Sequence, residues 1–454
     1  MTRIQVTVYE GRFIHSVEEY KLEYFSGCVG VDEQGSIAFV DREAANAHEA
    51  VRKQGISEAS VEIINESQTE MGFFFPGFFD THIHAPQFPN NGIFGDSTLL
   101  DWLNKYTFPM EASLKDTKRA KEVYSKVIET TLSNGTTTAS YFATNDAGAT
   151  KILADEAMRQ SQRAFIGRVC MVRNTPDYYQ DESDEAAHES DLKIVDYVSK
   201  LDPKRELVCP ILTPRFAPTC TESGMKWQGK VAVEKDLPIQ THLSENDNEI
   251  KWVGELYPNY RSYTDVYDKC GLLTERTILA HCVHLSEEER TILVQRKSGV
   301  SHCPVSNSSL TSGECPVREY IDKGIKVSLG TDCSGGFSPS ILSIARNAQL
   351  VSNHRVMKSK DNHQKLSFEE VLSLATLGGA NVCNLAHKLG NFQAGKKWDA
   401  QFVDLSKGAP RVFSWAIPDD QTEKLKYLAQ KWLFNGDDRN TTKVWVNGKL
   451  VVNK

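Results

Sequence analysis

The stretch PGFFDTHIHAPQ, Pro76 to Gln87, places two histidines, His82 and His84, at the end of a run of apolar and aromatic residues. Residues i and i+2 of a β-strand point to the same face, so both imidazoles can approach one metal ion. The pair alone is weak evidence, because buried structural histidines are common. It predicts a metal site only if further ligands stand at the ends of other strands.

The rest of the chain from residue 73 to residue 390 alternates short apolar strand patterns with longer helical ones. The eight strand candidates are GFFDTHIH, TTTASYFAT, AFIGRVCMV, LVCPILTPRF, PIQTHLSE, TILAHCVHL, VSHCP and KVSLGTDC. The helical patterns include residues 118–133, 155–160 and 184–201. This alternation predicts an α/β protein with a parallel (β/α)₈ barrel of the TIM type. An open doubly wound sheet is the alternative, but no G-x-G-x-x-G follows the first strand.

Both ends of the chain carry short strand patterns, unlike the alternating middle. These patterns are residues 3–9, 36–41 and 400–405 and the final VWVNGKLVV. Asn447 and Gly448 in the last pattern are a strong signal for a type I′ hairpin. We therefore expect a small β-sandwich domain built from residues 1–72 and 391–454, beside a barrel domain over residues 73–390.

Composition excludes several classes of function. The net charge is −8 and no basic block occurs, which argues against a nucleic-acid surface. The start of the chain has no apolar signal region, and the most apolar stretch, residues 71–79, is too short to cross a bilayer. The ten cysteines form no C-x-x-C pair and are typical of reduced, buried thiols. We expect a cytoplasmic protein without a membrane or nucleic-acid partner.

Three further candidate groups stand at the ends of later strand patterns: His242 in IQTHLSEN, His281 in LAHCVHLS and Asp332 in SLGTDCSGG. Catalytic residues of a barrel lie at the C-terminal ends of its strands, so these groups can meet His82 and His84. Each alone is typical of a packed histidine or a capping aspartate. Together they predict a metal site with the nitrogen and oxygen ligands that Zn²⁺ accepts.

Polar residues near these strand ends suit catalysis and binding of a flat ring. Glu245, three residues after His242, can transfer protons without being a ligand, although a first-turn helix glutamate is the alternative. The third and fourth strand patterns contain no lysine or carboxylate that would bridge two ions, so one metal is expected. At the fourth strand end, Arg215 can bond a carbonyl oxygen or form a structural salt bridge, and Phe216 can pack on a ring. The amide of Gln87 offers a donor and an acceptor to a heterocycle.

These residues, with longer strings around them, resemble the metal-dependent amidohydrolase superfamily and its branch that acts on guanine. The strings run over nearly the whole chain: PGFFDTHIHAPQ, LLDWLNKYTFPME, NGTTTASYFAT, TPRFAPTC, THLSEN, YTDVYD, HCPVSNSSLTSG and LGTDCSGG. The His-x-His motif occurs throughout the superfamily, whereas Gln87 and the Pro-Arg-Phe of residues 214–216 narrow the resemblance to the branch that acts on guanine. Cys333 and Ser334 stand where such proteins commonly have small apolar residues, a departure that leaves the ligand intact but can alter the pocket.

The resemblance implies hydrolysis of guanine to xanthine and ammonia in purine catabolism, by a homodimer with one Zn²⁺ per subunit. The implied metal ligands are His82, His84, His242 and Asp332. The implied catalytic residues are Glu245, His281 and Asp332. The implied substrate-binding residues are Gln87, Arg215, Phe216, Glu245 and Asp332.

Other functions stay open at this point. Another one-metal amidohydrolase could deaminate a different heterocycle, of the cytosine, triazine or adenosine type. The second zinc deaminase fold requires P-C-x-x-C, which this chain lacks. A non-catalytic relative would be expected to lose ligands, whereas this chain keeps all five candidate residues.

Overall fold

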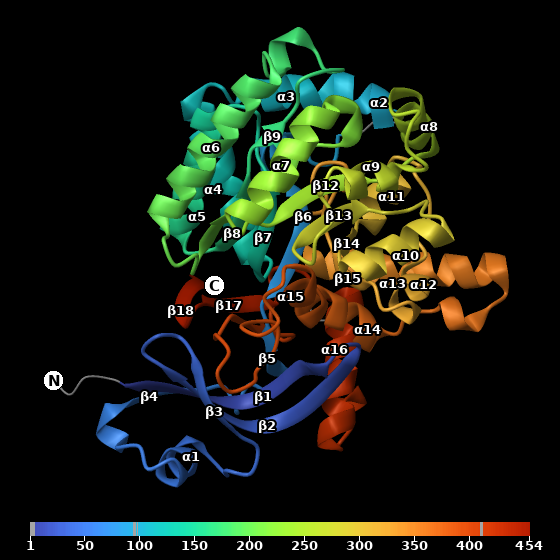
Figure 1. Ribbon diagram of the computed structural model, residues 1–454. Helices are drawn as coiled ribbons and strands as arrows, with labels where there is room; N and C mark the ends of the chain where they lie inside the picture. Colours follow the sequence, from blue (N-terminus) through green and yellow to red (C-terminus); the bar gives the residue numbers. More distant parts are fainter. Residues whose placement is uncertain (1–4, 94–96, 98, 409–411) are drawn as a thin grey trace.

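The computed structural model describes residues 5–454 except 94–96, 98 and 409–411 (Figure 1). Its middle part holds two four-stranded parallel sheets. The first has the order β10-β8-β7-β6, and the second β12-β13-β14-β15. The strands are β6 (Phe78–His84), β7 (Thr136–Phe142), β8 (Arg163–Gly167), β10 (Val208–Pro210), β12 (Ile239–Leu243), β13 (Thr277–His281), β14 (Gly299–His302) and β15 (Lys326–Leu329). Each predicted strand pattern in this region overlaps one of them.

The two parallel sheets are joined by backbone hydrogen bonds at both edges. On one side the amide of Gln240 donates to the carbonyl of Leu212 at 2.9 Å. On the other, the amide of Asp332 donates to the carbonyl of His82 at 2.8 Å. These bonds bring the ends of β6, β12 and β15 to one place.

Two predicted strands are interrupted. AFIGRVCMV forms β8 and then β9 (Val169–Cys170), and LVCPILTPRF forms β10 and then β11 (Thr213–Pro214), which pairs with β9. Pro210 and Pro214 in the second pattern have no amide hydrogen to donate to a continuous ladder. The second break precedes Arg215, which follows β11 directly.

The helices that follow the strands begin at side-chain caps. Asp116 accepts hydrogen bonds from the first turn of α4 (Thr117–Ser133), as the pattern over residues 118–133 predicts. Helix α5 (Ala147–Gln160) begins well before the predicted residue 155, because the Asp146 side chain accepts a bond from the amide of Ala149. Helix α6 (Asp184–Leu201) has the predicted bounds.

The remaining helical elements include α16 (Gln421–Asn435), which packs against β1 (Val6–Glu18) and β2 (Lys21–Asp32) of the sheet formed by the two ends of the chain. The α-helices are α1 (Ala47–Lys53), α2 (Leu99–Trp102), α3 (Phe108–Ser113), α7 (Glu222–Glu234), α8 (Asp247–Leu256), α9 (Tyr263–Lys269), α10 (Glu287–Arg296), α11 (Pro304–Ser309), α12 (Val317–Asp322), α13 (Ile341–Ser359), α14 (Phe368–Ser373), α15 (Gly379–Val382) and α16 (Gln421–Asn435). The 3₁₀ and π turns are η1 (Glu58–Ser60), η2 (Ala85–Asn90), η3 (Leu103–Thr107), η4 (Asp177–Tyr179), η5 (Ala217–Thr219), η6 (Asn362–Gln364), η7 (Leu374–Gly378) and η8 (Ser414–Ala416).

Strands from both ends of the chain share one eight-stranded sheet, which lies below the parallel sheets in Figure 1. Its order is β18-β17-β16-β5-β1-β2-β3, with β4 paired to β1. The strands are β1 (Val6–Glu18), β2 (Lys21–Asp32), β3 (Ile37–Asp41), β4 (Val61–Asn65), β5 (Gly72–Pro76), β16 (Ala400–Asp404), β17 (Thr441–Val446) and β18 (Lys449–Asn453). Asn447 and Gly448 join β17 to β18 with φ of 51° and 77°, the left-handed pair that the predicted type I′ turn requires.

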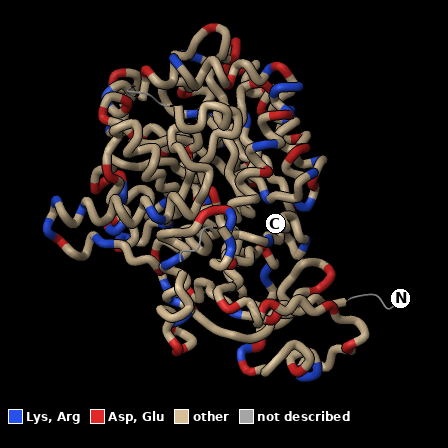
Figure 2. The backbone as a smooth tube through the Cα atoms, turned by 180° about the vertical axis from the view of Figure 1, so that it is seen from behind, with Lys and Arg blue, Asp and Glu red and all other residues tan. Residues whose placement is uncertain are grey.

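Charged residues of both signs and buried cysteines are spread along the chain. In the view of Figure 2, lysines and arginines are interspersed with acidic residues along the backbone. All ten cysteines are buried and free. Within the described residues, no helix combines the length and apolar character needed to cross a bilayer.

Candidate active site

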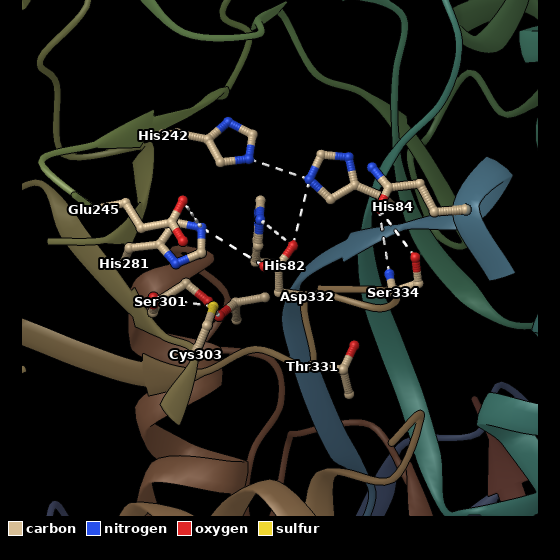
Figure 3. A network of polar contacts seen from close by, with 12 residues as sticks. His82, His84, His242, Glu245, His281, Ser301, Cys303, Thr331, Asp332 and Ser334 are labelled. Atoms are coloured by element: carbon tan, nitrogen blue, oxygen red, sulfur yellow. Dashed lines mark hydrogen bonds and ion pairs between the residues drawn. The ribbon is translucent and has the colours of Figure 1, made fainter. Parts of the chain in front are cut away.

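Four side chains expected as metal ligands converge where β6, β12 and β15 end (Figure 3). His84 Nε2 lies 3.1 Å from His242 Nε2. Asp332 Oδ1 lies 3.1 Å from His82 Nε2 and 3.5 Å from His84 Nε2. One possible ligand atom from each residue lies within 4.8 Å of those of the other three. The structure therefore brings together the whole predicted ligand set.

The chemistry of this cluster fits a bound cation. His242 Nδ1 lies 2.6 Å from the carbonyl oxygen of Arg215, to which it donates, so its Nε2 lone pair faces His84. Within the described residues, the buried His84 Nδ1 has no hydrogen-bond partner. Buried polar atoms without partners are costly unless another group satisfies them. Three imidazoles and a carboxylate are a ligand set of a divalent transition metal.

Burial and mutual contacts keep these groups in the protonation states that ligands need. Burial lowers the pKa of His82 and brings the pKa values of His84 and His242 well below the usual range, which favours neutral imidazoles. Burial opposes ionisation of Asp332, but hydrogen bonding and charge from His82, followed by His281 and His84, outweigh it. The pKa of Asp332 therefore lies well below its usual value.

The loop after β15 packs tightly around Asp332. The Asp332 backbone has a φ of 45°, in the left-handed region that non-glycine residues rarely adopt. A Cβ on Gly335 would lie 2.8 Å from Asp332 Oδ2, and a Cβ on Gly336 would lie 2.1 Å from the carbonyl oxygen of Thr331. The two glycines in DCSGG therefore allow the loop to fold back against the carboxylate.

His281 and Glu245 lie beside the ligands, as Figure 3 shows. His281 Nε2 is 3.6 Å from Glu245 Oε2 and 3.8 Å from Asp332 Oδ2, and its Nδ1 is 2.9 Å from the side-chain oxygen of Asn307. Glu245 Oε1 accepts a bond from Ser312 Oγ at 2.9 Å. Burial raises the pKa of Glu245. Burial alone would lower the pKa of His281, but Glu245 and then Asp332 raise it.

A cavity next to the ligands is lined by the three residues expected to bind a base, Gln87, Arg215 and Phe216, and by Glu245. Leu103, in the π turn η3, also lines it, and Leu103 and Phe216 line a wider cavity of about 380 Å³ as well. A π turn between α2 and α3 is a feature often found at functional sites. The predicted binding residues thus share one pocket with the predicted catalytic ones.

Sequence reasoning missed Glu111, Glu249 and Cys303 near the site. Glu111 is the salt-bridge partner of Arg215, whose role the sequence left open between a substrate contact and a salt bridge. Arg215 Nη1 and Nη2 donate to Glu111 Oε2 and Oε1 at 2.6 Å and 3.0 Å, and both side chains are buried. Glu249 also lines the cavity, and burial followed by the charge of Glu245 raises its pKa to about 7. Cys303 forms a second possible donor group with His82 and His281. The acidic residue in the apolar string FPME was the only available signal for Glu111.

Comparison with known proteins agrees with this geometry. Residues 73–451 match the model of the amidohydrolase family. The chain is 46% identical to a probable guanine deaminase of Schizosaccharomyces pombe over 98% of this chain and 83% of that protein. It is 42% identical to the guanine deaminase of Dictyostelium discoideum over 98% of both. A crystal structure of guanine deaminase from C. acetobutylicum with bound guanine shares 32% identity and a TM-score of 0.88, covering 98% of this chain and 99% of that one. The chain belongs to the amidohydrolase family.

Proposed function

We propose that the protein is a guanine deaminase that hydrolyses guanine to xanthine and ammonia in purine catabolism, with one zinc ion per subunit. The observation that carries the proposal is the cluster of three histidines and Asp332, of which only His242 is partly exposed, beside a pocket lined by Glu245, Gln87, Arg215 and Phe216. Full-length similarity to guanine deaminases supports this substrate over a cytosine, triazine or adenosine-type heterocycle.

The residues that would hold the zinc are His82, His84, His242 and Asp332. When bound, zinc lowers the pKa of a water molecule from about 15.7 towards 7. Asp332 has two separate tasks, because Oδ1 faces the histidine ligands whereas Oδ2 lies 3.8 Å from His281 Nε2. Oδ2 accepts a proton from the attacking water, and His281 orients that water.

Glu245 carries the second proton transfer. Its raised pKa favours a carboxyl that holds a proton, and its contacts with His281 and Ser312 fix the group at the cavity wall. It protonates a ring nitrogen beside C2 of guanine, so that C2 becomes more electrophilic and water adds there. A proton then passes to the exocyclic amine, and ammonia leaves.

Base recognition is assigned to Gln87, Arg215 and Phe216. Phe216 packs against the flat purine, while the amide and guanidinium groups bond its polar edge. A buried polar pocket rejects analogues that leave its groups without partners. This accounts for selection of one base among similar heterocycles.

The proposed frame for this site is a closed (β/α)₈ barrel over residues 73–390, supported by the hydrogen bonds at both edges of the two parallel sheets. Residues 1–72 and 391–454 are proposed as the small β-sandwich domain, although β5 (Gly72–Pro76) of its sheet extends past residue 72. The support for a sandwich is a contact between strands that are not neighbours in the sheet. The ring centroids of Tyr9 in β1 and Trp445 in β17 lie 5.4 Å apart, although β16 and β5 separate these two strands.

The proposed setting is the cytoplasm, in keeping with ten free and buried thiols. The proposed assembly is a homodimer, for which the family resemblance is the support.

The direct test is metal analysis of the purified protein together with ultraviolet assays on guanine, adenine, cytosine and guanosine. We expect one zinc per chain and conversion of guanine to xanthine, with far slower turnover of the other three. Absence of guanine turnover in zinc-loaded protein, or faster turnover of another substrate, would contradict the proposal.

Replacing Arg215 with alanine should chiefly weaken guanine binding, with KM rising about 100-fold because a charge-assisted contact is lost. Steady-state kinetics measures this. Arg215→Ala also leaves Glu111 without its cation, so melting temperature should fall. Arg168→Ala is the matched control, because Arg168 is buried and paired with Asp191 at 2.7 Å outside the pocket. It should lower melting temperature without raising KM. An unchanged KM and rate in Arg215→Ala would assign Arg215 a purely structural role.

A further inference from the structure

Glu111 is a fully buried carboxylate in α3 that accepts four hydrogen bonds. Oε1 accepts from Gln87 Nε2 at 2.7 Å and from Arg215 Nη2 at 3.0 Å. Oε2 accepts from Arg215 Nη1 at 2.6 Å and from the Tyr179 hydroxyl at 2.6 Å. Two of its three partners, Gln87 and Arg215, line the candidate pocket. The same carboxylate therefore holds both polar side chains assigned to base recognition.

These contacts determine what the recognition side chains can offer. A glutamine amide ordinarily presents either a donor or an acceptor, because it can turn over by 180°. Here Gln87 Nε2 donates to Glu111, while Gln87 Oε1 lies 3.3 Å from the backbone nitrogen of Ser334, which donates to it. The amide nitrogen of Gln87 therefore has one N–H left that can donate to a ligand. Arg215 has only N–H groups, of which two are used by Glu111.

We propose that Glu111 is a positioning residue that selects a 6-oxopurine, by holding Gln87 and Arg215 so that they present only N–H donors to the base. This inference rests on the proposed function. Deamination requires C2 at the catalytic groups, which leaves the O6 and N7 edge for recognition, and both atoms are acceptors. 2,6-Diaminopurine has the same reacting amine at C2 but an N–H donor at C6. A pocket edge made only of donors accepts guanine and rejects this analogue.

The test compares guanine with 2,6-diaminopurine in zinc-loaded wild type and Glu111→Gln, by ammonia release. The new amide cannot accept all four bonds, so Gln87 becomes free to turn its oxygen towards a 6-amino group. We expect kcat/KM for guanine to fall about 100-fold, mainly through KM, because charge-assisted contacts lose their alignment. The preference for guanine over 2,6-diaminopurine should fall at least about tenfold.

Asp191→Asn is a matched control. Asp191 is also buried and also accepts bonds from an arginine and a glutamine, Arg168 and Gln228, at 2.7 Å and 2.9 Å, but it lies outside the pocket. It should lower melting temperature and leave the preference for guanine unchanged. If Glu111→Gln behaves like this control, with both substrates affected equally, Glu111 is only structural and the inference is overturned.

A measurement on the wild type keeps the inference testable if Glu111→Gln does not fold. Hypoxanthine and adenine lack the C2 amine and serve as competitors of guanine turnover that differ at C6. Hypoxanthine should inhibit about 100-fold more tightly than adenine, and equal inhibition would overturn the donor-only edge. Wild type that turns over no guanine contradicts the proposed function itself. An unchanged preference in an active, folded Glu111→Gln contradicts only the role of Glu111.

Discussion

Glu245→Gln should lower kcat for guanine by about 10³-fold or more while one zinc per chain is retained. The amide has nearly the same size and can still accept the bond from Ser312 Oγ, but it cannot hold and release a carboxyl proton. Glu245 is not part of the four-residue ligand cluster, so its neutralisation leaves the metal site intact. Rate measurements and metal analysis on the same preparation check both expectations.

The control for this variant is Glu289→Gln. Glu289 is another buried glutamate, which accepts bonds from the backbone amides of Thr264 in α9 and of Ser286 before α10, and the oxygen of the amide can still accept one of them. It should retain normal turnover. Loss of zinc from Glu245→Gln would contradict the proton-transfer role, because it would make Glu245 a ligand.

Asp332→Ala should lose both metal and activity, with the rate falling at least about 10⁴-fold. The carboxylate supplies the oxygen ligand, so its removal leaves three imidazoles, and it is also the group assigned to accept the proton of water. Metal content per chain and kcat are the two measurements. Normal activity in this variant would refute the assignment.

Asp332→Asn separates the two tasks of this residue. The amide oxygen can remain near His82 and His84, whereas the amide is a poor proton acceptor. We expect this variant to keep more zinc than Asp332→Ala and yet to be almost as slow. Full activity in Asp332→Asn would assign proton acceptance to another group.

Much of the fold and the metal cluster follows from local pattern. His82 and His84 face one way because a strand repeats every two residues, and strand ends of parallel units gather at one edge, so His242 and Asp332 are expected beside them. The Asn447-Gly448 hairpin follows from the left-handed φ values that its turn requires. These features depend on residues close together in the chain or on a general rule of topology.

Other boundaries and contacts depend on interactions that the pattern does not contain. The apolar pattern LVCPILTPRF predicts one strand but forms β10 and β11, and between them the amide of Leu212 donates to the carbonyl of Pro238. Helix α5 begins early because Asp146 caps it, a signal that hydrophobic periodicity does not report. Joining of the terminal strands into one sheet depends on pairing between the two ends of the chain.

The sequence by itself determined which residue types stand at the strand ends, and hence a site of His82, His84, His242 and Asp332 with Glu245 nearby. Only the tertiary structure decided how the recognition residues are held. Glu111 is 104 residues from Arg215 and 24 from Gln87, and nothing in its own helix indicates that it accepts bonds from both. Periodicity reports the face on which a side chain lies, whereas the pairing of buried charges depends on which faces are packed together and closed to water.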